Sequence, residues 1–217
     1  MIRLARRLIL AFVLLAIPCV GFAAQGGGTG VVKIAGMVPP LAFTMQNAST
    51  GKTATEADFH GKVVMLYFGY TNCPDVCPDT LYKVHQVFLH LGKAADHVVL
   101  LFVTVDPKRD TLPVLKNYLA LFDPHFVGLR GSANQLYRLT RRYRVVASVH
   151  PSPNPEQYRV VHSALIYVFG EHGNGRLIIP DLGLNQHPDY AKLAADIETL
   201  TTTPPRSGFL GFLARLG

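Results

Sequence analysis

The sequence predicts an α/β domain in which helices flank a central, largely parallel sheet. Two short apolar runs, at 63–70 and 98–105, are rich in β-branched and aromatic residues, as expected of strands buried on both faces. A segment with helical spacing follows each run. Near the C-terminus, a polar turn at 171–175 separates two further apolar runs, which predicts an antiparallel hairpin added to the sheet.

The other elements continue this alternation of strands and helices. Leu81, Val84 and Phe88 recur at helical spacing after the first buried strand. Asp110 or Thr111 can cap the helix that follows the second one. In chain order we predict a hairpin at 43–53, a strand at 63–70, a helix at 79–89, a strand at 98–105, a helix from 110 toward 122, a strand at 126–129, a helix at 132–143, a proline-marked loop at 151–155, a hairpin of 164–169 with 177–179, and a helix at 189–200.

Length and composition indicate a single folded domain. The chain has 217 residues, of which 49% are apolar and 16% are charged, and this excludes a disordered protein. We divide it into a leader or membrane anchor at 1–24, a Gly-rich flexible linker at 25–36, a folded domain at 37–202 and a tail at 203–217 that carries an apolar segment.

The N-terminus has the layout of an export signal. Arg3, Arg6 and Arg7 precede an uncharged stretch at 8–24 that ends in small residues. Losing these three arginines lowers the net charge from +7 to +4, a mild basicity that requires no nucleic-acid partner. The stretch is also at the lower limit for spanning a bilayer, so a retained anchor is the alternative. We expect an exported protein, periplasmic and either soluble or tethered to the inner membrane.

Two of the three cysteines form a close pair. Cys19 lies in the leader, so cleavage after Ala23 leaves only Cys73 and Cys77. Small exported proteins whose fold depends on disulfides need several bridges, and one cysteine pair can form only one. The chain is therefore not a protein of that class. The pair follows a buried strand and precedes a helix, where unpaired N–H groups and the helix dipole favour thiolate over thiol. We therefore interpret the cysteine pair as a functional site near the surface, rather than as a structural disulfide.

The spacing of the pair favours a soft metal ion. Positions four apart share one helical face, so both sulfurs can bind one metal ion. They can also form a disulfide if the first turn is irregular. The spacing differs from the Cys-x-x-Cys of dithiol oxidoreductases, and no second pair completes a structural zinc site. Two thiolates suit Cu(I), with histidine as the most plausible third ligand.

The sequence narrows the choice of that histidine only a little. His85 lies two helical turns beyond Cys77, too far to share a metal ion with it. His162 leads into the strand at 164–169, which places it at a strand edge or loop mouth. The chain offers nine candidates: His60, His85, His90, His97, His125, His150, His162, His172 and His187.

At this point the sequence closely resembles the Sco/SenC family of copper-handling assembly proteins. The longest matching stretch, at 67–78, reads Tyr-Phe-Gly-Tyr-Thr-Asn-Cys-Pro-Asp-Val-Cys-Pro. Further matches follow at 105–111, at 126–131 and at 158–163 around His162. They occur in the same order as in the family, and the resemblance as a whole extends over roughly residues 37–200.

The resemblance implies a thioredoxin-like fold: a central mixed sheet flanked by helices, with an added hairpin. It implies one copper ion per chain, Cu(I) or Cu(II), bound by Cys73, Cys77 and His162. The family's usual role is maturation of the dinuclear copper centre of cytochrome c oxidase, by copper transfer or thiol reduction. The implied partners are the copper-bearing subunit of that oxidase or another copper-handling protein, and a thiol reductant.

Two points qualify this resemblance. Some members look like thiol-disulfide reductases or redox regulators, so the competing hypothesis is an exported oxidoreductase that uses Cys73 and Cys77 without copper delivery. Furthermore, the family commonly carries an aspartate before the histidine, where this chain has Val161. An aspartate can orient the imidazole, so we expect His162 to be a weaker or retuned ligand. Asp106 and Arg109 are expected to shape their loop rather than to bind metal.

Overall fold

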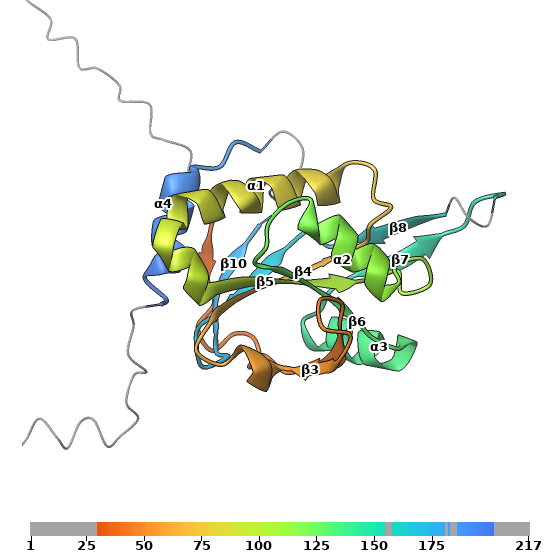
Figure 1. Ribbon diagram of the computed structural model, residues 1–217, viewed down its shortest axis with the longest axis horizontal. Helices are drawn as coiled ribbons and strands as arrows, with labels where there is room; N and C mark the ends of the chain where they lie inside the picture. The colour runs from red at the N-terminus through yellow and green to blue at the C-terminus, as the bar shows by residue number, and fades with distance from the viewer. Residues whose placement is uncertain (1–29, 155–157, 181, 183–185, 202–217) are drawn as a thin grey trace, which may run out of the picture.

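The computed structural model describes residues 30–154, 158–180, 182 and 186–201 (Figure 1). The predicted leader, Cys19, the first residues of the predicted linker and the tail at 203–217 lie outside the described residues. Among the residues that are described, no helix is long and apolar enough to cross a membrane.

An eight-stranded mixed sheet forms the centre of the molecule, in the order β1-β10-β9-β4-β5-β6-β2-β3. Its parallel pairs are β4 (Val63–Gly69) with β5 (Val98–Thr104), and β5 with β6 (Phe126–Arg130). Every residue of β4 and β5 is buried, as continuous apolar runs predict for strands covered on both faces. The predicted class, a mixed α/β sheet flanked by helices, is confirmed.

Antiparallel hairpins extend the sheet at both sides. The predicted N-terminal hairpin is β2 (Thr44–Asn47) with β3 (Thr53–Thr55), and the predicted C-terminal one is β9 (Ile166–Phe169) with β10 (Gly175–Ile179). A short strand, β1 (Val32–Lys33), pairs with β10. This strand lies inside the segment 25–36 that we expected to be a flexible linker, so the folded part begins before Met37.

Capping side chains that the sequence supplies mark the starts of α2, α3 and α4, but not that of α1. Thr111, rather than Asp110, caps α2 by accepting from the Val114 N–H, and Ser132 forms a capping box with Gln135 at the start of α3. In Figure 1, α1 and α4 run along one face of the sheet and α3 lies on the other. The α-helices are α1 (Val76–Leu91), α2 (Leu112–Ala120), α3 (Ala133–Arg142) and α4 (Tyr190–Glu198), and the 3-10 helices are η1 (Glu56–Phe59) and η2 (Gly92–His97).

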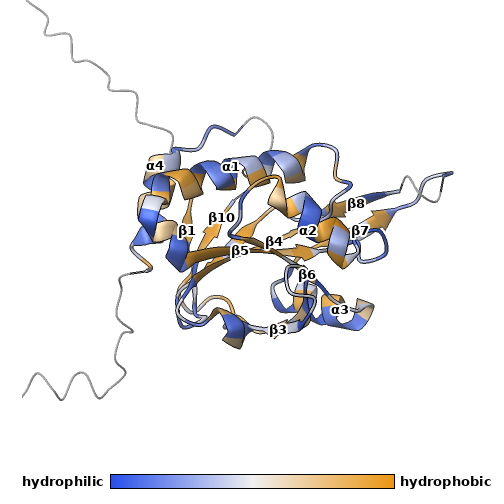
Figure 2. Cartoon of the chain, in the orientation of Figure 1, coloured by the Kyte–Doolittle hydropathy of each residue, from blue (hydrophilic) through white to orange (hydrophobic). Residues whose placement is uncertain are grey.

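Hydropathy separates the layers of the domain. Figure 2 shows apolar residues concentrated in the central strands, whereas α1, α2 and α3 alternate polar and apolar sides. The largest fully buried side chains include Tyr67 and Phe68 on β4 and Phe102 on β5. Large buried side chains of the core thus lie next to the cysteine segment, since the Tyr67 hydroxyl contacts the Cys77 sulfur.

A second, two-stranded sheet is the feature that the sequence did not predict. It pairs β7 (Ala147–His150) with β8 (Arg159–His162), on either side of the predicted proline-marked loop. Every residue of β7 is exposed, and Val160 alone is buried on β8, so neither strand has the buried apolar pattern that reveals a strand. Figure 1 shows this ribbon projecting from the body of the molecule.

Candidate metal centre

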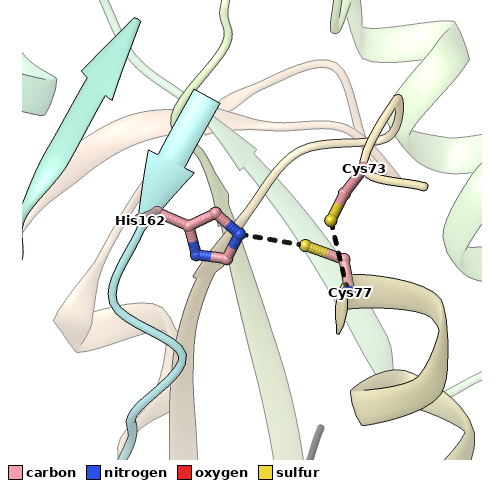
Figure 3. A group of neighbouring side chains, drawn as sticks. All are labelled: Cys73, Cys77 and His162. Carbon is pink, nitrogen blue, oxygen red and sulfur yellow. Dashed lines mark hydrogen bonds between the residues drawn. The ribbon is translucent and has the colours of Figure 1, made fainter. Parts of the chain in front are cut away.

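Three chain segments bring Cys73, Cys77 and His162 together. Cys73 lies in the loop after β4, Cys77 in the first turn of α1, and His162 at the end of β8, as Figure 3 shows. The two sulfurs and one imidazole nitrogen all lie within 4.8 Å of one another. Neither cysteine is in a disulfide. Among the described residues, this is the only cluster of at least three His, Cys, Asp or Glu side chains that could hold a metal ion.

The Cys73 sulfur serves as the acceptor at the N-terminus of α1. Asp75, at the N-cap position, makes no side-chain capping bond. Instead the Cys77 N–H donates to the Cys73 Sγ at 3.4 Å, one of the N–H groups that a helix start leaves unpaired (Figure 3). We expected both cysteines on one helical face. That expectation is wrong, because Cys73 lies outside the helix and reaches its N-terminus from the preceding loop.

Cys77 is fully buried, which corrects the expectation that both cysteines lie near the surface. Its sulfur lies 3.7 Å from the Tyr67 hydroxyl, which can donate to it. Gly69 makes this packing possible, because a Cβ there would lie 3.0 Å from the Cys77 Sγ and 2.7 Å from the Phe102 ring. The sequence pattern did not single out Tyr67 or Gly69 as site residues.

The two thiols have opposite acidities. The hydrogen bond from Cys77 lowers the pKa of Cys73 to about 3, and the helix N–H groups act in the same direction. The same contact with Cys73, together with burial, raises the pKa of Cys77 well above its usual value. In the metal-free pair these opposite directions favour a thiolate at Cys73 that accepts from a thiol at Cys77.

His162 presents its Nε2 atom to the cysteines. Nε2 lies 3.2 Å from the Cys77 Sγ, and Nδ1 lies 3.2 Å from the Ser163 carbonyl oxygen. A carbonyl can only accept, so we assign the ring proton to Nδ1, which leaves the Nε2 lone pair directed at the sulfurs. The expected position of His162, at a strand edge, is confirmed because it is the last residue of β8.

Val161 lies on the other face of the ribbon. Neighbouring residues of a strand point to opposite faces, and Val161 is 52% exposed, whereas His162 points into the cluster. An aspartate at 161 would therefore point away from the imidazole. The orienting acceptor in this chain is the Ser163 carbonyl.

The remaining candidates lie elsewhere. His85 contacts Asp123 at 2.8 Å, which agrees with its exclusion as a ligand. Asp106 and Arg109 form an ion pair within their own loop and contribute no atom to the cluster, as expected.

The family model for SCO1/SenC matches residues 41–201, and this range contains all three site residues. The chain belongs to the SCO1/SenC family. Its curated relatives include Protein SCO2 homolog, mitochondrial, of Bos taurus, which is 43% identical over 125 residues, covering 57% of this chain and 47% of the relative. Protein SCO1 homolog, mitochondrial, of Homo sapiens is 37% identical over 126 residues, covering 57% and 42%. This SCO1/SenC chain thus spans about half the length of the curated relatives it matches.

Solved structures agree with this assignment. Bradyrhizobium japonicum ScoI with copper bound is 35% identical with a TM-score of 0.65, and the match covers 74% of this chain and 98% of that one. Yeast Sco1 with copper bound is 31% identical with a TM-score of 0.67, covering 77% and 92%. The fold of this SCO1/SenC member is thus the thioredoxin-like fold that the resemblance implied.

Proposed function

We propose that this protein is a copper metallochaperone that binds one copper ion through Cys73, Cys77 and His162. The observation that carries the proposal is the meeting of two sulfurs and one imidazole nitrogen from three chain segments. Thiolate sulfur is a soft ligand that selects Cu(I), and imidazole also suits copper. Two similar solved structures, ScoI of Bradyrhizobium japonicum and yeast Sco1, are described as having copper bound.

The three donors arrive in different states. Cys73 is already a thiolate, whereas Cys77 must release its proton when the ion binds. Once Cys77 is a thiolate, the Tyr67 hydroxyl at 3.7 Å can donate to it and stabilise its charge. Copper uptake therefore releases one proton, chiefly from Cys77.

Copper is the cargo, so the site must also release it. Three protein ligands leave one side of the ion open to an incoming thiolate of a partner. Cys73 and His162 are partly exposed, whereas Cys77 is fully buried. We infer that the partner's sulfur replaces one of the two partly exposed ligands first and that the buried Cys77 holds the ion during the exchange.

The proposed acceptor is the copper-bearing subunit of cytochrome c oxidase or another copper-handling protein, in keeping with the family's role. The proposed compartment is an exported one, the periplasm, which the protein reaches through the N-terminal segment 1–24. N-terminal sequencing of the isolated protein tests the leader: a chain beginning after Ala23 supports cleavage, and one that retains residues 8–24 supports an anchor.

A copper titration tests the proposed site. The reduced chain should bind one Cu(I), measured by competition with a chromophoric chelator. Cys73→Ser and Cys77→Ser should each abolish this binding, while His162→Ala should weaken it without abolishing it. Asp79→Asn, on the same helix but outside the cluster, is the matched control. Binding of one Cu(I) per chain by the double cysteine variant would contradict the proposal.

A second candidate function is thiol-disulfide exchange, which the asymmetry of the pair favours. Cys73 is a half-exposed thiolate that can attack a partner disulfide, and Cys77 is a buried thiol that can resolve the mixed disulfide. The partner gains two electrons, the protein ends with a Cys73–Cys77 disulfide, and an external thiol reductant must restore it. Rapid turnover with a disulfide substrate in copper-free buffer would favour this function over delivery.

A further inference from the structure

The loop between β5 and α2 contacts both segments that carry the candidate ligands. This loop, residues 105–111, provides none of the three ligand atoms. Its side chains nevertheless reach Thr71, two residues before Cys73, and Tyr158, four residues before His162. We name the three loop residues that make these contacts, Asp106, Arg109 and Asp110, the bracket.

One side of the bracket holds the cysteine segment. Asp110 is fully buried and accepts from the Thr71 hydroxyl at 2.6 Å and from the Thr71 N–H at 3.1 Å. Thr104, the last residue of β5, donates its hydroxyl to Asp110 at 2.5 Å and accepts from the Asp106 N–H at 2.9 Å. This network connects the chain before Cys73 to the end of a central strand.

The other side holds the histidine strand. The Tyr158 hydroxyl donates to Asp106 at 2.6 Å, and Arg109 pairs with the same carboxylate. Arg109 also donates to the Tyr158 carbonyl oxygen at 3.1 Å and stacks over the Tyr158 ring at 3.7 Å. Three contacts therefore join one tyrosine, at the entry of β8, to this loop.

The ribbon needs such an attachment. Strands β7 and β8 pair only with each other and are not hydrogen-bonded to the central sheet. A two-stranded hairpin alone is marginally stable in water, and Val160 is the one buried residue of these two strands. Ser163, just after β8, bonds Val146, just before β7, so that contact lies within the ribbon. The position of His162 thus depends on contacts between β8 and other segments, and Tyr158 makes such a contact at the start of the strand.

We propose that the Asp106–Arg109–Asp110 bracket positions the candidate metal ligands, with Tyr158 as the residue that sets His162 against Cys77. Tyr158 acts through β8 and does not touch the ion. The copper-binding test of this inference rests on the proposed function, whereas the hydrogen-exchange test on the metal-free protein does not.

A double-mutant cycle tests the role of Tyr158. Tyr158→Phe removes only the hydroxyl that donates to Asp106 and keeps the ring that Arg109 covers. We expect this change to weaken Cu(I) binding by the reduced full chain about fivefold, the size of one lost hydrogen bond. In the His162→Ala background the same change should alter affinity by less than about twofold, because the ligand that it positions is absent. The matched control is Tyr137→Phe on α3, whose side chain is 64% exposed.

Two copper results overturn the proposal. Equal weakening in both backgrounds means that the hydroxyl serves general stability, and no weakening in either means that it does not position His162. If the unaltered chain binds no copper, the proposed function fails. The role of Tyr158 is then tested by amide hydrogen exchange of the metal-free protein. Tyr158→Phe should then speed exchange in β8 at least about fivefold relative to β10. Unchanged exchange in β8 overturns it.

Discussion

Cys73 and Cys77 lie four residues apart but occupy different environments. Cys73 is half-buried at a helix N-terminus, and Cys77 is fully buried between Tyr67 and Gly69. Placement between a strand and a helix predicts thiolate chemistry for the pair, and this stays a prediction. The sequence did not reveal the asymmetry, which depends on one thiol donating to the other.

Alkylation of the metal-free protein tests this asymmetry. A thiol whose pKa is lowered is deprotonated at every pH above that pKa, so Cys73 should react with iodoacetamide at a nearly constant rate from pH 6 to pH 8. Cys77, protonated and buried, should stay unlabelled, as peptide mass spectrometry can establish. A rate at Cys73 that rises about tenfold per pH unit toward 8.5, as for an ordinary thiol, contradicts the assignment.

Gly69 gives a second prediction at the scale of one residue. Gly69→Ala places a methyl group 3.0 Å from the Cys77 Sγ and against Phe102, which should cost about 1–3 kcal/mol of unfolding free energy and weaken copper binding. Gly128→Ala is the matched control, since its methyl group meets Leu115 and Ala48 but no site residue. Urea unfolding and copper competition of both variants separate the effects. Equal losses of copper affinity would refute a local role for Gly69.

At the scale of elements, the β7–β8 ribbon carries the third candidate ligand yet was not predicted. Buried strands such as β4 and β5 are recognisable because apolar runs record their burial. The ribbon is largely exposed and is joined to the loop at 105–111 through one side chain, Tyr158, which leaves no periodic pattern. His162 could be chosen among nine histidines only through the family resemblance.

The geometry of the ribbon also determines how Val161 affects the site. Because residue 161 points away from the cluster, Val161→Asp should change Cu(I) affinity by less than about threefold. His162→Ala, measured in parallel by the same chelator competition, should cause a clearly larger loss. An affinity gain of tenfold or more in Val161→Asp would show that an aspartate here does reach the imidazole.

At the scale of the whole molecule, copper would tie together segments far apart in the chain. Cys73 and Cys77 belong to the β4–α1 connection, whereas His162 belongs to a ribbon outside the main sheet. The order of the central elements was predictable, since strands and helices alternate with clear periodicity. The convergence was not, because it depends on side-chain bonds between the loop at 105–111 and two other segments.

A ligand that binds only the folded chain stabilises it. At a free concentration of 100 times the dissociation constant, Cu(I) should add about 2.7 kcal/mol, which corresponds to a rise in Tm of about 5–10 °C. Scanning calorimetry of the reduced chain, with and without copper, measures this shift. The double variant Cys73→Ser, Cys77→Ser should show none, and an equal shift in that variant would mean that copper binds elsewhere.

X-ray absorption at the copper edge tests the central claim most directly, because it identifies the atoms around the ion. The Cu(I)-loaded chain should show two sulfur ligands and one imidazole nitrogen, and the His162→Ala variant should retain the two sulfurs without the imidazole signature. Coordination by sulfur alone in the unaltered chain, or an imidazole signature that persists in His162→Ala, would contradict the assignment of Cys73, Cys77 and His162 as the copper ligands.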